Sequence, residues 1–153
     1  MKITDFLAPE MVMPQLSGQD KAQVLKELAQ GLAAHHPEIR IEELIAVLTE
    51  REKLGSTAIG DGIAIPHGKL AGVERIIGAF GRHAKGVDFE SLDGNPTHLF
   101  FVLVAPEDST NLHLKALARV SRLFKDPSFR QKLIEAADAD EIFRLIKEED
   151  ARF

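Results

Sequence analysis

His67 is the residue whose surroundings in the sequence are best suited to chemistry. It follows the apolar run Ile63–Ile65 and Pro66, and Gly68 comes directly after it. Proline fixes its own φ and has no N–H, so we expect the extended run to end at Pro66. Gly68 permits almost any turn. We therefore predict that His67 lies at an abrupt corner, where its side chain faces a cleft rather than the core.

Arg51 and His113 are the residues that could complete a site with His67. Arg51 comes near the end of an expected helix, and His113 lies in the first turn of a helix that follows an apolar strand. Ligands in layered α/β folds gather where strand ends meet helix N-termini. An Arg fork, two imidazoles and the free N–H groups of "GST" and "GDG" would bind a phosphoryl group, with one imidazole as nucleophile. The same spacing also fits a core histidine whose ring hydrogen-bonds a carbonyl group.

Other kinds of site are less well supported by the spacing. The remaining histidines are expected to be structural: His35 and His36 at a helix end, His83 in a polar turn and His98 at the start of a buried strand. A metal site would need His67, His113 and a distant carboxylate such as Asp61, because no H-x-x-x-H or H-E-x-x-H spacing occurs. Ser56 and Ser109 occur in no G-x-S-x-G elbow, and no G-x-x-x-x-G-K-[ST] loop is present to bind a nucleotide.

The apolar residues predict five helices that would position these side chains. They recur at helical spacing on both sides of a glycine-rich middle segment. The expected helices cover 18–35, 41–53, the segment after "EDSTN", a segment that begins at Pro127, and about 139–149. Ser17 is the expected N-cap of the first helix and Asp138 that of the last.

The middle of the chain predicts a sheet. Eight glycines fall from Gly55 to Gly86, interleaved with β-branched residues, and predict short strands and tight turns. The continuous apolar run 98–106 predicts a strand covered on both faces. The glycine-rich segment has room for hairpins but not for several helical crossovers, so the sheet should be mixed. The predicted fold class is α/β (α+β), a three-layer helix–sheet–helix sandwich with a mixed β-sheet.

The composition favours one soluble, cytoplasmic domain over residues 1–153. A chain of 153 residues buries roughly 68–70% of its unfolded surface. Its net charge of −5, without a basic block, argues against a nucleic-acid partner. The absence of cysteine excludes disulfides, thiolate metal sites and a Cys nucleophile. No apolar run has the length of a signal peptide or a membrane span, so we expect no contact with a membrane.

Segment 51–70, "REKLGSTAIGDGIAIPHGKL", resembles the phosphorylation-site signature of enzyme IIA domains of the bacterial phosphotransferase system, in the mannitol/fructose-type superfamily. The match includes the Arg-Glu pair, Gly-Ser-Thr, Ile-Gly and Gly-Ile-Ala-Ile-Pro-His-Gly. The resemblance extends from the opening "ITDFLAPE" to the C-terminal "DADEIFRLI". "IPHGKL", together with the opening, is more similar to the nitrogen-related branch, a regulatory phosphocarrier, than to the sugar-transporting branches. The length implies that no enzyme IIB or IIC domain is attached.

The resemblance implies a role for individual residues. His67 would be the phosphorylated nucleophile, accepting a phosphoryl group on Nε2 from a phosphorylated histidine of an HPr-like donor protein. Arg51 matches the arginine beside the active histidine, and His113 matches the second histidine of the cleft. Ser56 and Thr57 would line the same pocket and bind the substrate, or their hydroxyls would serve only the local turn. The resemblance implies no metal and no other cofactor.

The chemistry of the transfer adds two expectations about the pocket. A histidine with a pKa near 6.5 is about three quarters neutral at pH 7, so no separate general base is required. The phosphohistidine must also resist water, which predicts a shallow, partly apolar pocket with Ile59, Ile63 or Ile65 nearby.

Three functions stay open at this point. The leading hypothesis is a phosphotransferase system component that carries a phosphoryl group and acts chiefly as a regulator, through contact with target proteins. The alternative within the family is a sugar-type enzyme IIA that passes the phosphoryl group to a separate enzyme IIB. The third is a binding module in which phosphorylation has been lost, against which the presence of Arg51, His67 and His113 speaks.

Overall fold

The helices form where apolar residues recur at helical spacing, as predicted. In the computed structural model, which describes residues 1–153, they are α1 (Lys21–His35), α2 (Ile41–Lys53), α3 (Thr110–Leu123), α4 (Pro127–Glu135) and α5 (Ala139–Asp150). Short 3₁₀ turns cover Ile3–Asp5 and Pro9–Met11. The Asp138 side chain caps α5, as expected, by accepting a hydrogen bond from the Glu141 N–H at 2.9 Å. No helix has the length and apolar character that crossing a membrane requires.

The start of α1 differs from the prediction. The helix begins at Lys21, and its N-cap is Asp20 rather than Ser17. The Asp20 carboxylate accepts a hydrogen bond from the Gln23 N–H at 2.8 Å, which satisfies one of the free donors of the first turn. Ser17 lies outside the helix, where its N–H donates to the Glu27 carboxylate. An Asp three residues further on therefore takes the capping role.

The strands form one mixed sheet, as predicted. They are β1 (Val12–Met13), β2 (Ala58–Gly60), β3 (Ile63–Ala64), β4 (His67–Lys69), β5 (Ile77–Val87) and β6 (Thr97–Ala105). The order is β1-β5-β6-β3-β2, with β4 also paired to β6. β5 and β6 are antiparallel, as are β2 and β3, whereas β1 pairs with β5, and β3 and β4 pair with β6, in parallel.

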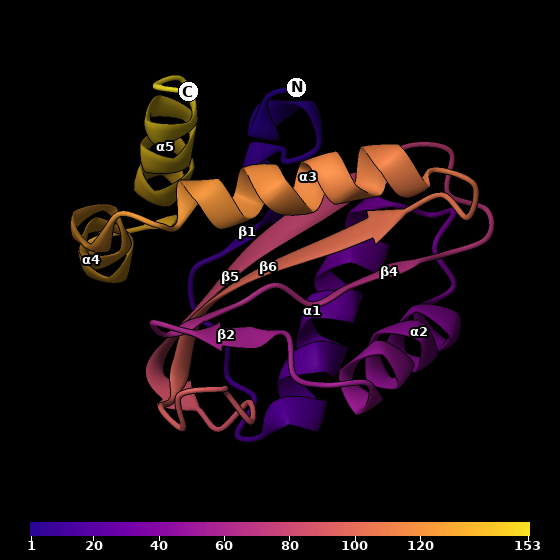
Figure 1. The fold of residues 1–153 in the computed structure, drawn as a ribbon, viewed down its shortest axis with the longest axis horizontal. Coiled ribbons are helices and arrows are strands. Elements are labelled where there is room, and N and C mark those ends of the chain that lie inside the picture. Colours follow the sequence, from indigo (N-terminus) through magenta and orange to yellow (C-terminus); the bar gives the residue numbers. More distant parts are fainter.

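The helices cover both faces of this sheet, which gives the predicted three layers (Figure 1). Phe80 of β5 and Phe101 of β6 are paired, and both rings contact Phe124 at the end of α3. The next residue of β5, Gly81, faces α1 instead: a Cβ there would lie 3.1 Å from a methyl group of Leu28. Side chains alternate across a strand, so α3 lies on one face and α1, with α2, on the other. α5 packs against α3 and β1.

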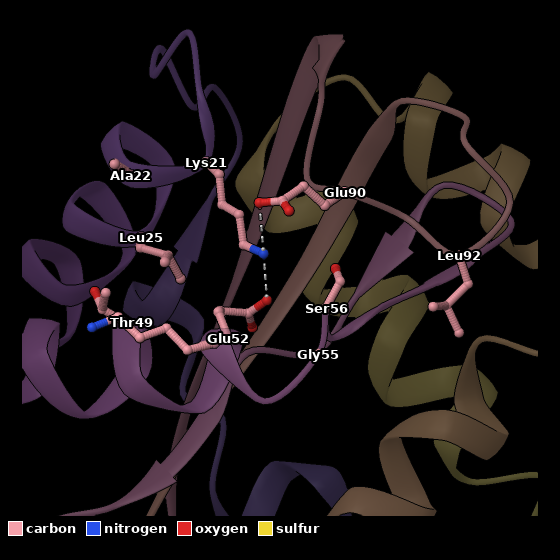
Figure 2. Close-up of a pocket in the computed structure, with 10 residues that line it drawn as sticks. Lys21, Ala22, Leu25, Thr49, Glu52, Gly55, Ser56, Glu90 and Leu92 are labelled. Carbon is pink, nitrogen blue, oxygen red and sulfur yellow. Dashed lines mark hydrogen bonds and ion pairs between the residues drawn. The ribbon is translucent and has the colours of Figure 1, made fainter.

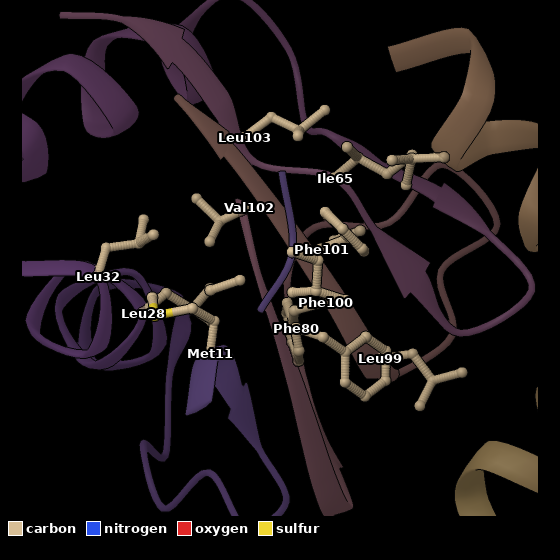
Figure 3. Packing of buried hydrophobic residues seen from close by; sticks show 14 of the residues in the cluster. Met11, Leu28, Leu32, Ile65, Phe80, Leu99, Phe100, Phe101, Val102 and Leu103 are labelled. Carbon is tan, nitrogen blue, oxygen red and sulfur yellow. The ribbon is translucent and has the colours of Figure 1, made fainter. Parts of the chain in front are cut away.

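β6 lies at the centre of the core, as its sequence predicts. Every residue from Leu99 to Ala105 is buried. Figure 3 shows the side chains of this strand among Leu28 and Leu32 of α1, Phe80 of β5 and Ile65. One hydrophobic cluster of 42 buried residues connects the sheet to the helices. A strand in contact with helices on both faces has no polar face, which explains its continuous apolar run.

The second glycine-rich stretch does not form short strands and tight turns. "RIIGAFGRHAKG" lies mostly in the single strand β5, which spans 11 residues. Gly81 serves close packing here, because a Cβ at this position would lie 2.7 Å from Leu16 Cδ1. A glycine within a strand can mark close approach of a neighbouring segment as well as a turn. Composition alone did not distinguish the two.

Candidate functional site

His67 does not lie at a corner, contrary to the prediction. It is the first residue of β4, and β4 lies in line with β3 along the same neighbour, β6. Ile63 pairs with Leu99 and His67 with Leu103, so the register is the same before and after Pro66. The Pro66 carbonyl still accepts a hydrogen bond from the Leu103 N–H at 2.9 Å. Pro66 interrupts the ladder because it has no N–H to donate, but the chain does not turn.

Gly68 has a different role from the expected turn. It lies within β4, where a Cβ would be 2.3 Å from Val47 Cγ1 of α2. Glycine here allows β4 to approach α2 closely on one face of the sheet. Because side chains alternate along a strand, His67 then projects to the other face, toward α3. The strand therefore holds the imidazole between Arg51 at the end of α2 and His113 at the start of α3.

Two hydrogen bonds fix the tautomer of His67. Its Nδ1 lies 2.8 Å from the Ile65 carbonyl oxygen. A carbonyl oxygen only accepts, so Nδ1 carries the proton and donates. Nε2 then holds a lone pair, which accepts a hydrogen bond from Arg51 Nε at 3.3 Å. The arrangement leaves Nε2 as a nucleophilic nitrogen beside a cation.

The surroundings of His67 keep its ring neutral at neutral pH. Burial lowers its pKa below the ordinary value of 6.5, and the Arg51 cation lowers it further. Two other effects raise the pKa of His67: its hydrogen bond to the Ile65 carbonyl and the negative charge of the Glu52 carboxylate. They do not reverse the downward shift. A lowered pKa increases the share of the neutral ring, which is the nucleophilic form.

Arg51 lies in the last turn of α2, where a cation also suits the helix dipole. Its Nη1 donates to the Gly55 carbonyl at 3.0 Å and its Nε points at His67. Arg51 as a whole is half-buried. Its fork can bind two oxygens of a phosphoryl group at once, which a point charge such as lysine cannot do. The structure therefore brings Arg51 and His67 together, as the sequence predicted.

His113 meets His67 from the opposite side. It lies in the first turn of α3, and the two rings are edge to face with centroids 5.4 Å apart. His113 is 6% exposed, and its buried Nε2 has no hydrogen-bond partner in the protein. Burial, together with the charges of His67 and Lys69, lowers the pKa of His113 to about 4. The sequence predicted this pairing of two histidines, which are 46 positions apart.

Lys69 is a cation that the sequence analysis did not assign to the site. It lies two residues after His67 in β4, and its Nζ donates to the Thr110 hydroxyl at 2.6 Å. Thr110 is the first residue of α3, the helix that carries His113. Residues i and i+2 of a strand point to the same face. Once the segment is known to continue as a strand, the period of two identifies Lys69, whereas the expected corner at His67 obscured it.

The hydroxyls of Ser56 and Thr57 are engaged in contacts away from His67. Ser56 Oγ donates to the Phe89 carbonyl at 2.6 Å and accepts from the Ala58 N–H at 3.1 Å. Thr57 Oγ1 donates a short hydrogen bond to the Glu52 carboxylate, and its N–H donates to the same group at 3.1 Å. These contacts fit the second expectation, in which the hydroxyls serve the local turn. No contact to His67 supports substrate binding by either hydroxyl.

The apolar surroundings of His67 match the expectation in part. Ile63 and Ile65 are buried in the core, whereas Ile59 is 56% exposed on β2. No group of three or more His, Cys, Asp or Glu side chains lies close enough together to hold a metal ion. His67 and His113 therefore have no carboxylate, Asp61 included, as a third ligand.

The other histidines lie outside this cluster. His83 is a buried residue of β5 rather than a residue of a polar turn, and its Nε2 donates to the Gly18 carbonyl at 2.7 Å. His98 Nδ1 donates to the His83 carbonyl at 3.1 Å. Both side chains connect segments of the fold through backbone carbonyls. These contacts agree with the structural role that was expected for them.

Comparison with known proteins identifies similar sequences and structures over nearly the whole length. The family described as "Phosphoenolpyruvate-dependent sugar phosphotransferase system, EIIA 2" matches residues 5–149. The chain is 47% identical to a nitrogen regulatory protein of Bradyrhizobium diazoefficiens, over 95% of each chain. It is 39% identical to the fructose-specific EIIABC component of Bacillus subtilis, over 98% of this chain and 24% of that protein.

Among solved structures, the fold matches the nitrogen regulatory protein IIA-Ntr from Neisseria meningitidis. The TM-score is 0.88 at 33% sequence identity, and the match covers 94% of this chain and 98% of that one. The residues matched by the family include Arg51, His67 and His113.

Proposed function

The chain belongs to the enzyme IIA family of the phosphoenolpyruvate-dependent phosphotransferase system, in its nitrogen-related branch, and from this premise we propose that His67 is its phosphoryl-carrying residue. In this proposal His67 accepts the phosphoryl group on Nε2 from a phosphohistidine of an HPr-like carrier protein. Phosphorylation then changes which regulatory target proteins the molecule contacts.

The observation that carries the proposal is the state of the His67 ring. Nδ1 is committed to the Ile65 carbonyl at 2.8 Å, and Nε2 faces the Arg51 guanidinium at 3.3 Å. A neutral imidazole whose unprotonated Nε2 lies beside a cation is suited to attack phosphorus while negative charge develops on the phosphoryl oxygens. The two hydrogen bonds therefore favour Nε2 over Nδ1 as the nitrogen that attacks phosphorus.

The proposed transfer needs neither a metal nor a separate base, because its bonds, electron pairs and protons balance without them. The bond from phosphorus to the donor imidazole breaks, and the donor nitrogen keeps the electron pair. A bond from phosphorus to His67 Nε2 forms, and Nδ1 keeps its proton, which stays hydrogen-bonded to the Ile65 carbonyl oxygen. Phosphoryl transfer of this kind depends on positioning and charge stabilisation rather than on covalent chemistry by the protein. Arg51 is the stabilising cation, and His113 donates a hydrogen bond to the transferred group.

The regulatory role rests on the relatives. Those in Bradyrhizobium diazoefficiens and Neisseria meningitidis are named nitrogen regulatory proteins, and both are matched over nearly their whole length. The relative in Bacillus subtilis is a fructose-specific EIIABC component. It supports the second candidate, a sugar-type enzyme IIA that passes the phosphoryl group to a separate enzyme IIB. Because the family draws on phosphoenolpyruvate, a cytoplasmic metabolite, the proposal assigns the protein to the cytoplasm.

The test is incubation with phosphoenolpyruvate, enzyme I and an HPr-type donor, followed by intact-mass measurement. The wild type should gain the mass of one phosphoryl group, and His67→Ala should gain none while melting near the wild-type temperature. Labelling of His67→Ala to the wild-type extent would contradict the assignment. A wild type that stays unlabelled with every HPr-type donor would favour the binding module.

A second measurement separates the two phosphorylated candidates. The phosphorylated protein is mixed with a fructose-type enzyme IIB domain, and loss of label from His67 is followed over time. A carrier that is chiefly regulatory should keep its phosphoryl group for a time in which a sugar-type enzyme IIA would pass on many phosphoryl groups. Rapid transfer to the IIB domain would instead support the sugar-type function.

A further inference from the structure

We propose that Glu52 is a positioning residue for phosphoryl transfer, because its buried carboxylate holds the loop that in turn holds Arg51 against His67. The loop consists of Gly55, Ser56 and Thr57 and is called the 55–57 loop below. The inference rests on the proposed function, in which Arg51 stabilises the charge on the phosphoryl group at His67.

The carboxylate of Glu52 is buried, and both its oxygens have partners. The side chain is 5% exposed, and Oε1 lies 2.9 Å from the Lys21 ammonium. Oε1 also accepts a hydrogen bond from the Thr57 N–H at 3.1 Å, and Oε2 accepts a short one from the Thr57 hydroxyl. Hydrogen bonds to a charged acceptor are strong, and a buried charge that loses its partners is strongly destabilising. Glu52 therefore connects the 55–57 loop to α1 through Lys21.

Gly55 connects the same loop to Arg51. Its carbonyl accepts a hydrogen bond from Arg51 Nη1 at 3.0 Å, and its N–H donates to the Glu52 carbonyl at 3.1 Å. Gly55 has a φ of 140°, in the region that favours glycine, and this lets the chain turn at the end of α2. Gly55 thus holds Nη1 of Arg51, and Nε of the same guanidinium donates to His67 Nε2. A shift of the loop would therefore move the guanidinium relative to the imidazole.

A cavity of about 540 Å³ that is open to solvent lies beside the 55–57 loop, and Gly55 and Ser56 are among its lining residues. Figure 2 shows Lys21 reaching between Glu52 and Glu90, with Ser56 near them. The Lys21 ammonium also lies 4.9 Å from the centre of the Phe89 ring. A segment beside a cavity lacks the dispersion contacts that fix core segments on that side. Polar contacts must therefore fix the loop on this side. Glu52 accepts three of them: two from Thr57 at its carboxylate and one from the Gly55 N–H at its carbonyl.

The first test uses Thr57→Val, which removes one donor to Glu52 and keeps every charge. Arg51 lowers the pKa of His67, so a guanidinium released from the loop should let this pKa rise toward its value in Arg51→Ala. The pKa is measured by NMR titration of the His67 ring. Thr57→Ser keeps the hydroxyl and should keep the wild-type pKa. A wild-type pKa in Thr57→Val would overturn the proposal, whether or not the protein accepts phosphoryl groups.

The second test is a double-mutant cycle on the rate of transfer from the HPr-type donor. Glu52→Gln should slow transfer roughly tenfold or more at saturating donor with KM unchanged, because a displacement of about 1 Å can reduce a rate about 100-fold. In the Arg51→Ala background the same substitution should have no further effect. Equal effects in the two backgrounds would overturn the proposal.

A matched control is available on the same helix. Glu50→Gln makes the same chemical change at a carboxylate that is 70% exposed and paired with Lys53. It should transfer at the wild-type rate, and a loss equal to that of Glu52→Gln would also contradict the proposal. If the wild type accepts no phosphoryl group, the proposed function fails, and the titration of His67 alone decides whether Glu52 positions Arg51.

Discussion

His67 and His113 meet edge to face, with ring centroids 5.4 Å apart and ring planes at 77°. His67 is tied to its own strand through Nδ1, whereas the buried Nε2 of His113 has no partner in the protein. A buried polar atom without a partner destabilises the fold by about 1–3 kcal/mol. In the proposed transfer, a phosphoryl group arrives beside this atom when it binds His67. A phosphoryl group on His67 would supply the oxygen that it lacks.

His113 should therefore act in the transfer as a hydrogen-bond donor. Gln supplies an N–H of similar reach and Ala supplies none, so His113→Gln should keep much of the transfer rate and His113→Ala should lose most of it. Both variants should still be labelled at His67 only. The measurement is rapid-quench phosphoryl transfer, with melting temperature as the control. Wild-type transfer in both variants, or melting far below the wild type in both, would show that His113 serves packing alone.

The pH dependence of stability should report the burial of His113. Its pKa is lowered to about 4 from 6.5, so the unfolded chain binds more protons than the folded protein between these values. Stability is therefore fully present above pH 6.5 and decreases as the pH falls toward 4. Chemical denaturation over this range should show a smaller decrease for His113→Gln than for the wild type. If the free energy of unfolding decreased equally in the two proteins, the lowered pKa of His113 would be contradicted.

Lys69 should contribute to the low pKa of His113. Its cation is one of the causes that lower this pKa, after burial and the charge of His67. Lys69→Met removes the charge and keeps most of the side-chain volume, so an NMR titration should find the pKa of His113 above its wild-type value. Lys53→Met, at the end of α2, removes an exposed cation and should leave it unchanged. The same pKa in wild type and Lys69→Met would show that Lys69 does not act on His113.

Arg51 should act mainly on the rate of transfer. The loss of one charged donor to the developing phosphoryl charge typically reduces the rate on the order of 100-fold, and this is expected for Arg51→Ala. Arg51→Lys should restore little of the rate, because an ammonium cannot form the fork. The rates are measured by rapid quench with the same HPr-type donor. Equal rates for wild type and Arg51→Ala would rule out the role, and a large loss of melting temperature would favour a structural one.

Gly68 should be required for the close approach of β4 and α2. An added Cβ would lie 2.3 Å from Val47 Cγ1, so Gly68→Ala should reduce the free energy of unfolding by about 1–3 kcal/mol. Val47→Ala removes the opposing methyl groups and should recover part of this loss in the double variant. Urea denaturation of the three proteins measures the effect. Wild-type stability of Gly68→Ala would show that β4 has room to move.

The sequence predicted the features that depend on local patterns. Helix spacing identified α2 and the buried run of β6 identified the central strand, because burial on one or both faces is visible in the order of apolar residues. It also assigned Arg51, His67 and His113 to one site, and the structure brings them together.

Features that depend on contacts between distant segments could not be predicted in this way. Gly68 has an ordinary strand conformation, and its need for a small side chain comes from Val47 of another element. The burial of the Glu52 carboxylate is explained by its ion pair with Lys21, 31 positions earlier. The motif gives no indication of that contact. The sequence does not point to Lys69, because Pro66 and Gly68 predict a corner at His67, and a corner would end the alternation of side chains along the strand. Proline and glycine report a local constraint but not which neighbour imposes it.

The most direct test of the account is the position of the phosphoryl group on the phosphorylated protein. Protein labelled with ¹⁵N at histidine is phosphorylated by an HPr-type donor, and coupling between ³¹P and ¹⁵N identifies the bonded nitrogen. The account predicts one phosphorus signal, coupled to Nε2 of His67, with Nδ1 still protonated and donating its hydrogen bond to the Ile65 carbonyl. A phosphoryl group on Nδ1 of His67, or on His113, would contradict it.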